Sequence, residues 1–590
     1  MQPGYETIGN AGTLFVSGRN GCDGAWWRKI LIFDELREIQ HTHGYLPPEP
    51  LRALSKELNV PLYRINGVAE FYPEFHLSPP AKIHIEVCRD MTCHMRGADQ
   101  LISDLRQRFL PVGKKVVDVH ERSCLGRCDS APAMTINEEL FQNVTVEQAE
   151  ILVQTCLAGS DLPRQTFIRP PVALKADPYQ GVEKYGALRK LLETRDWDGV
   201  IATLKAAGLG GMGGAGFPTS IKWDVVRKAS GDEKYVICNA DESEPGTFKD
   251  RFIMTHAPHL VVEGVIIGAL VTGARTGYIY IRHEYKEQEA ILREEIEYCK
   301  RENLLGDHIL DTDLAFDLSV FVSPGGYICG EGSAQLEAIE GKRAEPRNKP
   351  PNSATQGLWM KPTALNNVET FANVPQILAR GVEWFKSQGH HPAASGLKFV
   401  GISGDVLRPG VYEIPMGLPL SEVVFNLAGG PPGGRKVKAF APSGAASGYQ
   451  PASKLDTRLD FKSMSAAGTM LGSGAIVVLD ETRCILDMAL NSVTFFRNES
   501  CGKCVPCRMG SAKLTDILAG WTHGKGVESD LALIADLSDT MKLTSICGLG
   551  QFVPYPILTA LENFREEIEA HILHRKCPAG VCPMRDEPLR

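Results

Sequence analysis

Several features are missing from this sequence, and each absence excludes a class of protein. No run of about 18 consecutive apolar residues is long enough to span a membrane. Acidic residues outnumber basic ones by 71 to 63, and the formal net charge of -8 gives no sign of affinity for nucleic acid. No basic residue precedes Arg19, and Gly4, Asn10 and Gly12 interrupt the apolar stretches before it, so we expect neither a secretory signal nor a transit peptide. These absences predict a soluble, cytoplasmic protein.

The sequence also lacks any defensible arrangement of Ser, His and Asp, or of Cys and His, for nucleophilic catalysis. Cysteine, by contrast, is plentiful, with 16 in 590 residues gathered at ligand-like spacings. In a reducing compartment such spacings are typical of thiolates that hold metal rather than of disulfides. A hydrophobic content of 43% is enough for about three or four domains with cores of their own.

The most informative cysteines lie near the C-terminal end. Cys501, Cys504 and Cys507 follow a CxxCxxC spacing, and Cys547 comes 40 residues after the last of them. Three thiolates in one tight loop and a fourth from another element are typical ligands of a 4Fe-4S cluster. A structural zinc site is the alternative, but its four cysteines usually come as two separated CxxC pairs. We therefore predict a 4Fe-4S cluster and electron transfer through the protein.

A second cysteine set lies in the first quarter of the chain. Cys88 and Cys93 form a Cx4C pair, and Cys124 and Cys128 form a Cx3C pair. Each pair follows an apolar stretch, 82–87 and 115–119, that reads as a strand, and 97–109 between them has helical spacing. Two strand ends could thus present four thiolates to a 2Fe-2S cluster. Spacing alone leaves zinc open here.

The C-terminal tail carries a third set of metal-binding side chains. Cys577 and Cys582 follow His571, which is expected on a helix, and Cys484 precedes the 4Fe-4S loop. Three cysteines and one histidine would suit a tetrahedral zinc ion. The alternative is a pair of reduced thiols at a flexible end.

A glycine-rich string opens the largest part of the chain. Residues 208–216 contain six glycines, whose backbone can bring several N–H groups close to a phosphate. Taken alone, the string could equally be a flexible loop. Three further blocks follow it, at 238–250, 327–332 and 361–370.

Two family resemblances rest on these residues. The segment 43–47, the run 65–72 and the first-quarter cysteines resemble the thioredoxin-like 2Fe-2S subunit of respiratory complex I over residues 30–150. This resemblance implies that Cys88, Cys93, Cys124 and Cys128 are the ligands of a 2Fe-2S cluster. The glycine string and the three blocks resemble, over 185–569, the flavin- and nucleotide-binding subunit of complex I and of soluble hydrogenases and formate dehydrogenases.

The resemblances imply an α/β multidomain fold. The domains expected are a helical N-terminal segment with a thioredoxin-like 2Fe-2S domain (1–156), a linker (157–184), a Rossmann-like FMN and dinucleotide-binding domain (185–390), a ubiquitin-like SLBB β-grasp domain (391–482) and a 4Fe-4S helical bundle with a Cys-rich tail (483–590). The sequence supports the fourth unit independently, because 399–406, 410–414 and 472–479 read as short strands.

The same resemblance implies a set of cofactor-binding residues. Glu242 and Glu244 are expected at the flavin and nicotinamide, as catalytic residues, although a helix cap or a turn would account for the acidic pair as well. Hydride then passes between nicotinamide and FMN, which releases electrons singly to the clusters. The residues expected around FMN and the dinucleotide are Gly211, Gly213, Gly214, Gly216, Phe217, Lys222, Asn239, Asp241, Glu242, Gly330, Glu331, Lys349, Asn366 and Asn367.

The chain departs from the family pattern where the dinucleotide is selected. Gly332 stands where the NADH-using relatives have a glutamate, which would accept the ribose hydroxyls and repel a 2′-phosphate. Val225 and Asn352 replace two aromatic residues, and Lys349 and Arg347 remain as candidate phosphate partners. NADP(H) is therefore a live alternative to NAD(H).

These observations predict an NAD(P)H dehydrogenase (diaphorase) subunit that exchanges electrons with a formate dehydrogenase, a hydrogenase or a similar iron–sulfur subunit. The alternatives are an NADP(H)-preferring or electron-bifurcating variant, and a non-catalytic relay with a degenerate dinucleotide site. No nucleic acid and no direct membrane insertion are expected.

Overall fold

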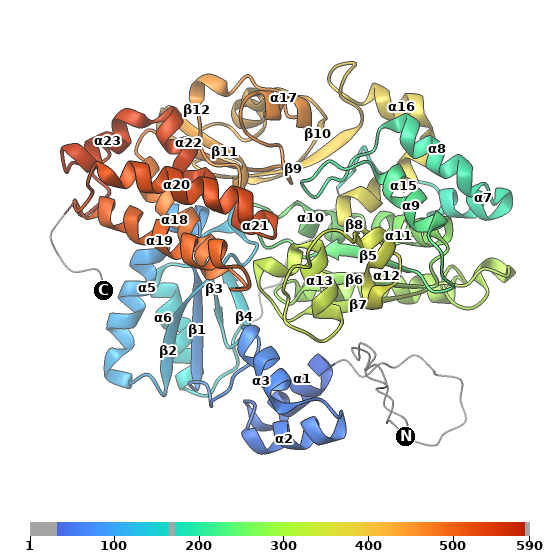
Figure 1. Ribbon diagram of the computed structural model, residues 1–590, viewed down its shortest axis with the longest axis horizontal. Coiled ribbons are helices and arrows are strands. Elements are labelled where there is room, and N and C mark those ends of the chain that lie inside the picture. Colours follow the sequence, from blue (N-terminus) through green and yellow to red (C-terminus); the bar gives the residue numbers. More distant parts are fainter. Residues whose placement is uncertain (1–31, 164–171, 585–590) are drawn as a thin grey trace, which may run out of the picture.

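The computed structural model describes residues 32–163 and 172–584, arranged as a helical segment, three sheet domains and a helical bundle (Figure 1). The first 31 residues, which bear on the expected absence of a targeting segment, lie outside the described part. The N-terminal helices are α1 (Ile32–His43), α2 (Pro48–Glu57) and α3 (Leu62–Phe71). They pack on the flavin-motif part of the chain, since the ring of Phe33 contacts Tyr72 and Phe321 and the Tyr72 hydroxyl donates to the carbonyl of Lys342.

The first sheet domain presents the first-quarter cysteines. Its order is β2-β1-β3-β4, with β1 and β2 parallel and the other pairs antiparallel. The predicted strands and the predicted helix between them are present, and the strands end at the cysteine loops. The elements are β1 (Ile83–Cys88), α4 (Thr92–Met95), α5 (Ala98–Phe109), β2 (Val117–Arg122), β3 (Ala133–Ile136), β4 (Glu139–Gln142) and α6 (Val146–Leu157).

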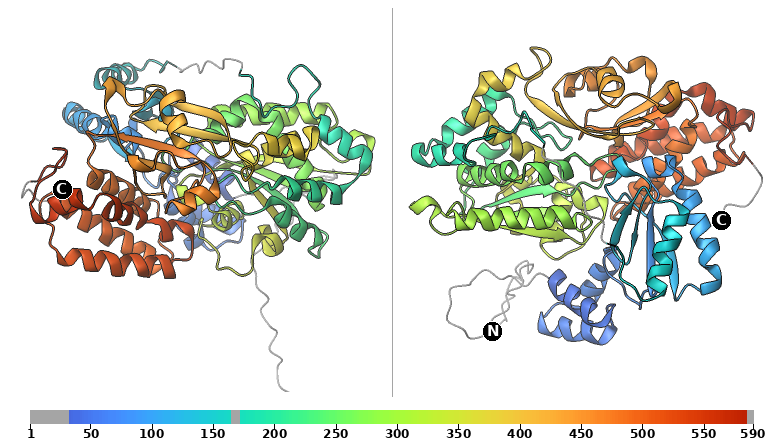
Figure 2. Two further views of the ribbon diagram at one scale, coloured as in Figure 1. Left: turned by 90° about the horizontal axis from the view of Figure 1, so that it is seen from above. Right: turned by 180° about the vertical axis from the view of Figure 1, so that it is seen from behind.

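The central domain is a parallel sheet of order β7-β6-β5-β8 with helices packed against it (Figure 2). Its longest buried helix, α11, packs on α15 so closely that a Cβ at Gly264 would lie 2.1 Å from the carbonyl oxygen of Phe371. The elements are α7 (Gly186–Thr194), α8 (Trp197–Ala207), α9 (Thr219–Lys228), β5 (Tyr235–Ala240), α10 (Lys249–His256), α11 (Pro258–Thr272), β6 (Thr276–Arg282), α12 (Lys286–Arg301), β7 (Asp317–Ser323), α13 (Gly332–Ile339), α14 (Ser353–Gln356), β8 (Thr363–Asn367), α15 (Val368–Arg380) and α16 (Val382–Ser387).

The expected linker is only partly a linker. Leu174, Ala176 and Tyr179 are buried in the core of the central domain, and the Tyr179 hydroxyl donates to Glu263 on α11 at 2.9 Å. Residues 164–171 lie outside the described part. The segment 172–184 therefore belongs to the central domain by its packing.

The third sheet has the order β10-β9-β13-β11-β12, and the strands predicted at 399–406, 410–414 and 472–479 are its members β9, β10 and β13. It lies between the central domain and the C-terminal helices (Figures 1 and 2). Its elements are β9 (Leu397–Gly404), β10 (Gly410–Pro415), β11 (Val437–Ala445), β12 (Gln450–Pro451), α17 (Phe461–Ala466) and β13 (Ala475–Asp480).

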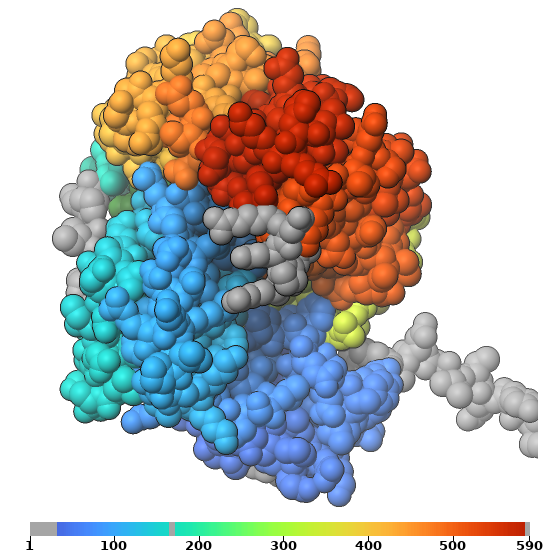
Figure 3. All heavy atoms as spheres, turned by 90° about the vertical axis from the view of Figure 1, so that its left-hand side faces the viewer, coloured from blue at the N-terminus to red at the C-terminus, as the bar shows by residue number. Residues whose placement is uncertain are grey.

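The C-terminal bundle packs beside the first sheet domain, as the face in Figure 3 shows. His94 of α4 contacts Asp487 of α18 at 2.7 Å, and Thr92 contacts Ser403 of β9 at 2.9 Å. The bundle comprises α18 (Ile485–Asn498), α19 (Val505–Thr522), α20 (Ser529–Thr544), α21 (Gly548–Phe552), α22 (Tyr555–Asn563) and α23 (Arg565–Leu573).

Among the described helices, none is by itself both long and apolar enough to cross a membrane. The pair α10 and α11 passes a test of length and composition together, but the two helices meet at 94°. All but the first residue of α11 are buried inside the central domain.

Candidate functional site

The polar residues expected around FMN gather at the carboxyl ends of two neighbouring strands. Asn239 lies at the end of β5, Asp241 follows that strand, and Asn366 and Asn367 end β8. The Asn239 side chain donates to the carbonyl of Gly330 at 2.9 Å. Carboxyl ends of parallel strands are the usual binding edge of an open α/β sheet, so the fold assembles this part of the predicted site.

The glycine-rich string forms a compact loop between α8 and α9. The N–H of Gly211 donates to the carbonyl of Phe217 at 2.9 Å, and Gly216, with a φ of 63°, adopts the left-handed region. A Cβ on Gly213 would lie 2.8 Å from the Cβ of Asn367. Only glycine therefore lets the loop reach the end of β8. Gly214 lies in the same loop, and Phe217 is half exposed beside it.

Lys222 lies on the first turns of α9 and points to the same edge of the sheet. Its Nζ donates to the carbonyl of Leu365 at 2.6 Å, and burial lowers its pKa to about 8. A buried cation with one neutral partner is well placed to interact with an anionic phosphate or reduced flavin.

Two buried polar atoms at this edge have no hydrogen-bond partner among the described residues. They are Oδ2 of Asp241 and Nδ2 of Asn366, one an acceptor and the other a donor. Unpaired buried polar groups are costly, so the edge suits a ligand that offers both kinds of partner. The isoalloxazine ring and ribityl chain of FMN do so, and the residues present therefore fit that cofactor.

The acidic pair has structural partners of its own. Glu242 accepts the N–H groups of Asp250 and Arg251 at 2.8 and 3.0 Å and thereby caps α10, which is the alternative that the sequence left open. Glu244 accepts the N–H of Ala446 at 2.9 Å. Burial raises the pKa of each carboxyl to about 7. Both acids thus hold the loop that follows β5.

Glu331 also caps a helix, since it accepts the N–H groups of Ser333 and Ala334 at the start of α13. Lys349 donates to it at 3.0 Å, and the effect of Lys349 contributes to lowering the pKa of Glu331 against the opposing effect of burial. Arg347 is held by Glu337, by Glu340 and by the carbonyl of Gly357. Of the two candidate phosphate partners, the half-exposed Lys349 is the less engaged.

The first-quarter cysteines come together beneath the loop that follows β5. All four are buried, the sulfurs of Cys124 and Cys128 are 3.7 Å apart, and the Cys88 thiol interacts with Cys124 and Cys93, which raises its pKa. The N–H of Gly246, in the central domain, donates to the sulfur of Cys128 at 3.3 Å. The four residues suit a 2Fe-2S cluster.

Two buried arginines that sequence reasoning missed hold this cysteine loop. Arg282 donates to the carbonyls of Cys124 and Glu242, at 2.6 and 2.5 Å, and Arg251 donates to the carbonyl of Gly126 at 2.7 Å. Single arginines that act across a domain interface leave no local pattern. The only available signal was the position of Arg251 directly after the 238–250 block.

The other four predicted cluster ligands line one pocket at the surface of the bundle. Cys501, Cys504, Cys507 and Cys547 all face it, and Cys504 and Cys547 immediately precede α19 and α21. Helix N-termini favour negative charge, so these positions suit the thiolates of a 4Fe-4S cluster.

Tyr327 lies between the flavin motif and the bundle. Its ring is 5.1 Å from that of Phe495, its N–H donates to Glu499 at 2.6 Å, and its hydroxyl interacts with Glu244. A polar cavity beside it reaches Cys124 on one side and Cys501 on the other. The two cluster sites and the flavin edge therefore meet around this residue. The tail residues Cys484, His571, Cys577 and Cys582 also come together, at a separate place in the bundle.

A flavin edge and two cysteine sets in one chain define a flavin- and iron–sulfur-containing oxidoreductase subunit. Family models agree in every part: thioredoxin-like [2Fe-2S] ferredoxin (28–157), Nuo51 FMN-binding domain (204–376), SLBB domain (399–445) and NADH-ubiquinone oxidoreductase-F iron-sulfur binding region (487–571).

Individual relatives agree with these matches. The chain is 41% identical to the NADP-reducing hydrogenase subunit HndC of Solidesulfovibrio fructosivorans, over 74% of this chain and 87% of the relative. It is 44% identical to an F-type NADH-quinone oxidoreductase subunit of Rhizobium meliloti (strain 1021), over 68% and 95%. The chain therefore belongs to the family of F-type NADH-quinone oxidoreductase subunits.

A solved structure extends the likeness to nearly the whole chain. A chain of an NAD+-reducing [NiFe]-hydrogenase in the H2-reduced state matches with a TM-score of 0.81 and 30% identity, covering 92% of this chain and 94% of that one. The combination of all four domains in one polypeptide is thus a known architecture.

Proposed function

We propose that this chain exchanges hydride between a nicotinamide dinucleotide and FMN and relays single electrons through its 4Fe-4S and 2Fe-2S clusters to or from a partner subunit in the cytoplasm. The observation that carries the proposal is the meeting of the flavin edge and both cysteine sets around Tyr327 and the loop after β5. When bound, FMN accepts a hydride and gives up its electrons one at a time.

The residues of the flavin edge have distinct roles in this proposal. Asp241 and Asn366 offer their unpaired atoms to FMN, and Lys222 neutralises negative charge on it. Glu242 keeps the loop after β5 in place through α10, and Glu244 lies buried between Tyr327 and the third sheet. Their proposed contribution to catalysis is to shape the nicotinamide side of the flavin.

The partner is inferred from the relatives. One relative is a subunit of an NADP-reducing hydrogenase, and the matching structure is that of an NAD+-reducing [NiFe]-hydrogenase. A hydrogenase subunit is therefore the first candidate, and a formate dehydrogenase or similar iron–sulfur subunit is the second.

A second candidate function, preference for NADP(H), rests on Gly332. A Cβ there would make ordinary contacts with Leu365, at 3.5 Å or more, so the site has room for a side chain and lacks one. No carboxylate at this position opposes a 2′-phosphate, and Lys349 on the neighbouring segment could approach it.

The relay is tested with the variant Cys504→Ser and the control Cys156→Ser, which changes a cysteine outside all three sets. We expect NAD(P)H to bleach the flavin of the Cys504 variant while the EPR signal of the 4Fe-4S cluster is lost and that of the 2Fe-2S cluster is kept. An unaltered 4Fe-4S spectrum would reject the ligand assignment, and an unreduced flavin in the control would reject the dehydrogenase.

A further inference from the structure

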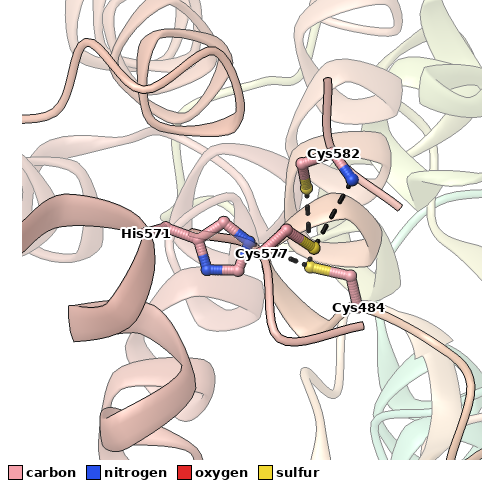
Figure 4. Close-up of side chains that lie close together, drawn as sticks. All are labelled: Cys484, His571, Cys577 and Cys582. Carbon is pink, nitrogen blue, oxygen red and sulfur yellow. Dashed lines mark hydrogen bonds between the residues drawn. The ribbon is translucent and has the colours of Figure 1, made fainter. Parts of the chain in front are cut away.

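Four side chains from three separate segments meet inside the C-terminal bundle. Cys484 immediately precedes α18, His571 lies on α23, and Cys577 and Cys582 belong to the tail that follows it; the four point toward one another (Figure 4). All four are buried, and one ligand atom from each lies within 4.8 Å of every other. None of them belongs to the flavin edge or to either cluster set.

The distances fit a single tetrahedral ion. With Zn–S of about 2.3 Å and Zn–N of about 2.0–2.1 Å, a regular tetrahedron places two sulfurs about 3.8 Å apart and a sulfur and a nitrogen about 3.5 Å apart. The sulfurs of Cys484 and Cys582 are 3.6 Å apart, and Nε2 of His571 is 3.4 Å from the sulfur of Cys484. The side chains are thus already spaced as ligands.

Surrounding hydrogen bonds prepare two of these side chains for a cation. Nδ1 of His571 lies 2.7 Å from the carbonyl of Glu567, which accepts the ring proton and leaves Nε2 free as a ligand. The N–H groups of Val581 and Cys582 donate to the sulfur of Cys577 at 3.3 and 3.4 Å, and Gly580 adopts the left-handed turn that brings them there. Such bonds stabilise a thiolate.

We propose that Cys484, His571, Cys577 and Cys582 bind one zinc ion as a structural site. Three thiolates and an imidazole are a frequent zinc ligand set, and four protein ligands leave no open position for a substrate. Zinc has no accessible redox change, so this site lies outside the electron path.

The ion joins parts of the chain that no other covalent or metal link connects among the described residues. Cys484 lies at the junction of β13 and α18, and the tail passes α19, where the N–H of Met584 donates to the carbonyl of Thr522 at 3.1 Å. Helix α19 begins beside the 4Fe-4S ligands. The zinc therefore fixes the bundle at the end away from that cluster.

The experiment measures zinc in the purified full-length protein that carries its FMN and clusters. Elemental analysis is expected to find one zinc per chain in addition to the cluster iron, and the zinc-edge X-ray absorption spectrum is expected to fit three sulfurs and one nitrogen. A protein with full iron but no zinc would overturn the proposal. So would a spectrum dominated by oxygen ligands, or a disulfide between Cys484 and Cys582.

Variants locate the ion. Cys582→Ser and His571→Ala are expected to lose the zinc and to melt at a lower temperature while both cluster EPR signals persist, and the control Cys156→Ser is expected to keep the zinc. Zinc retained in both ligand variants would overturn the assignment. If either variant fails to fold, the absorption spectrum of the unmodified protein still decides.

Discussion

Gly332 adjoins Glu331, the cap of α13, and contributes no side chain to a position where a carboxylate would select against NADP(H). We predict that Gly332→Glu lowers kcat/KM for NADPH relative to NADH by about tenfold or more, because a negative charge near the 2′-phosphate costs on the order of 1–2 kcal/mol. Steady-state kinetics with both dinucleotides measures the ratio. Gly332→Gln has the same size without the charge, and an equal shift in that control would refute the electrostatic reason.

Gly213 makes the closest approach of the glycine loop to β8. We predict that Gly213→Ala loses most of its FMN, because the added methyl would lie 2.8 Å from the Cβ of Asn367 and must push the loop away. The FMN content after gel filtration measures the loss. Gly67→Ala, in the open space of α3, is the control and should keep its flavin. Normal FMN content in the Gly213 variant would show that the loop does not bind the cofactor.

At this scale, the sequence predicted the residues that come in patterns. The cysteine spacings indicated both cluster sets and the tail set, and the fold brings each together. Arg251 and Arg282 could not be predicted, because their partners are carbonyl groups in another domain. The structural partners of Glu242 were foreseen only as an alternative.

Among the elements, the helices of the bundle present the cluster ligands, and helix α11 holds the segment 172–184. Glu263 of α11 accepts the hydroxyl of Tyr179 and the N–H of Leu188, each at 2.9 Å. Burial raises the pKa of Glu263 to about 7. Between its unfolded pKa, near 4.5, and about 7, the folded state binds more protons than the unfolded state, so this carboxyl makes stability fall as pH rises.

We therefore predict that Glu263→Gln removes part of this decline. Across that range the wild-type carboxyl costs about 3 kcal/mol, and the glutamine has no proton to lose. The melting temperature should fall less between pH 5 and pH 8 in the variant than in the wild-type protein. Glu569→Gln, on the surface of α23, is the control. An equal fall in the Glu263 variant and the wild type would show that the carboxyl ionises normally.

Strands with alternating or apolar sequence were predictable, and the predicted strands of the first and third sheets are present. The segment 157–184 was predicted as a linker because it is rich in proline and polar residues. Its buried part could not be predicted, because Leu174 and Tyr179 find their partners in the central domain and not in their own neighbourhood.

In the whole molecule, the central domain and the third sheet meet at a buried group of charges. Glu369 of α15 accepts Nζ of Lys398 on β9 at 2.5 Å and lies 3.0 Å from Nζ of Lys249. It also accepts the N–H of Phe399 at 2.8 Å. All three side chains are fully or almost fully buried, so the group holds the two domains in one arrangement.

We predict that Glu369→Gln destabilises the protein by about 3–5 kcal/mol, because it leaves two buried lysines without their shared carboxylate. Thermal unfolding of the holoprotein measures the change. Glu569→Gln, which breaks an exposed pair with Arg565, should cost less than about 1 kcal/mol. A variant as stable as that control would mean that the buried charges do not hold the interface.

The central claim is that electrons from a nicotinamide dinucleotide enter this chain at its flavin and reach both clusters. The most direct test is an anaerobic titration of the FMN-replete protein with NADH and, separately, with NADPH, followed by flavin absorbance and cluster EPR. We predict bleaching of the flavin and reduced-cluster signals at low concentration of at least one dinucleotide. Intact flavin and clusters that neither dinucleotide reduces would contradict the claim and leave a chain that only relays electrons between partners.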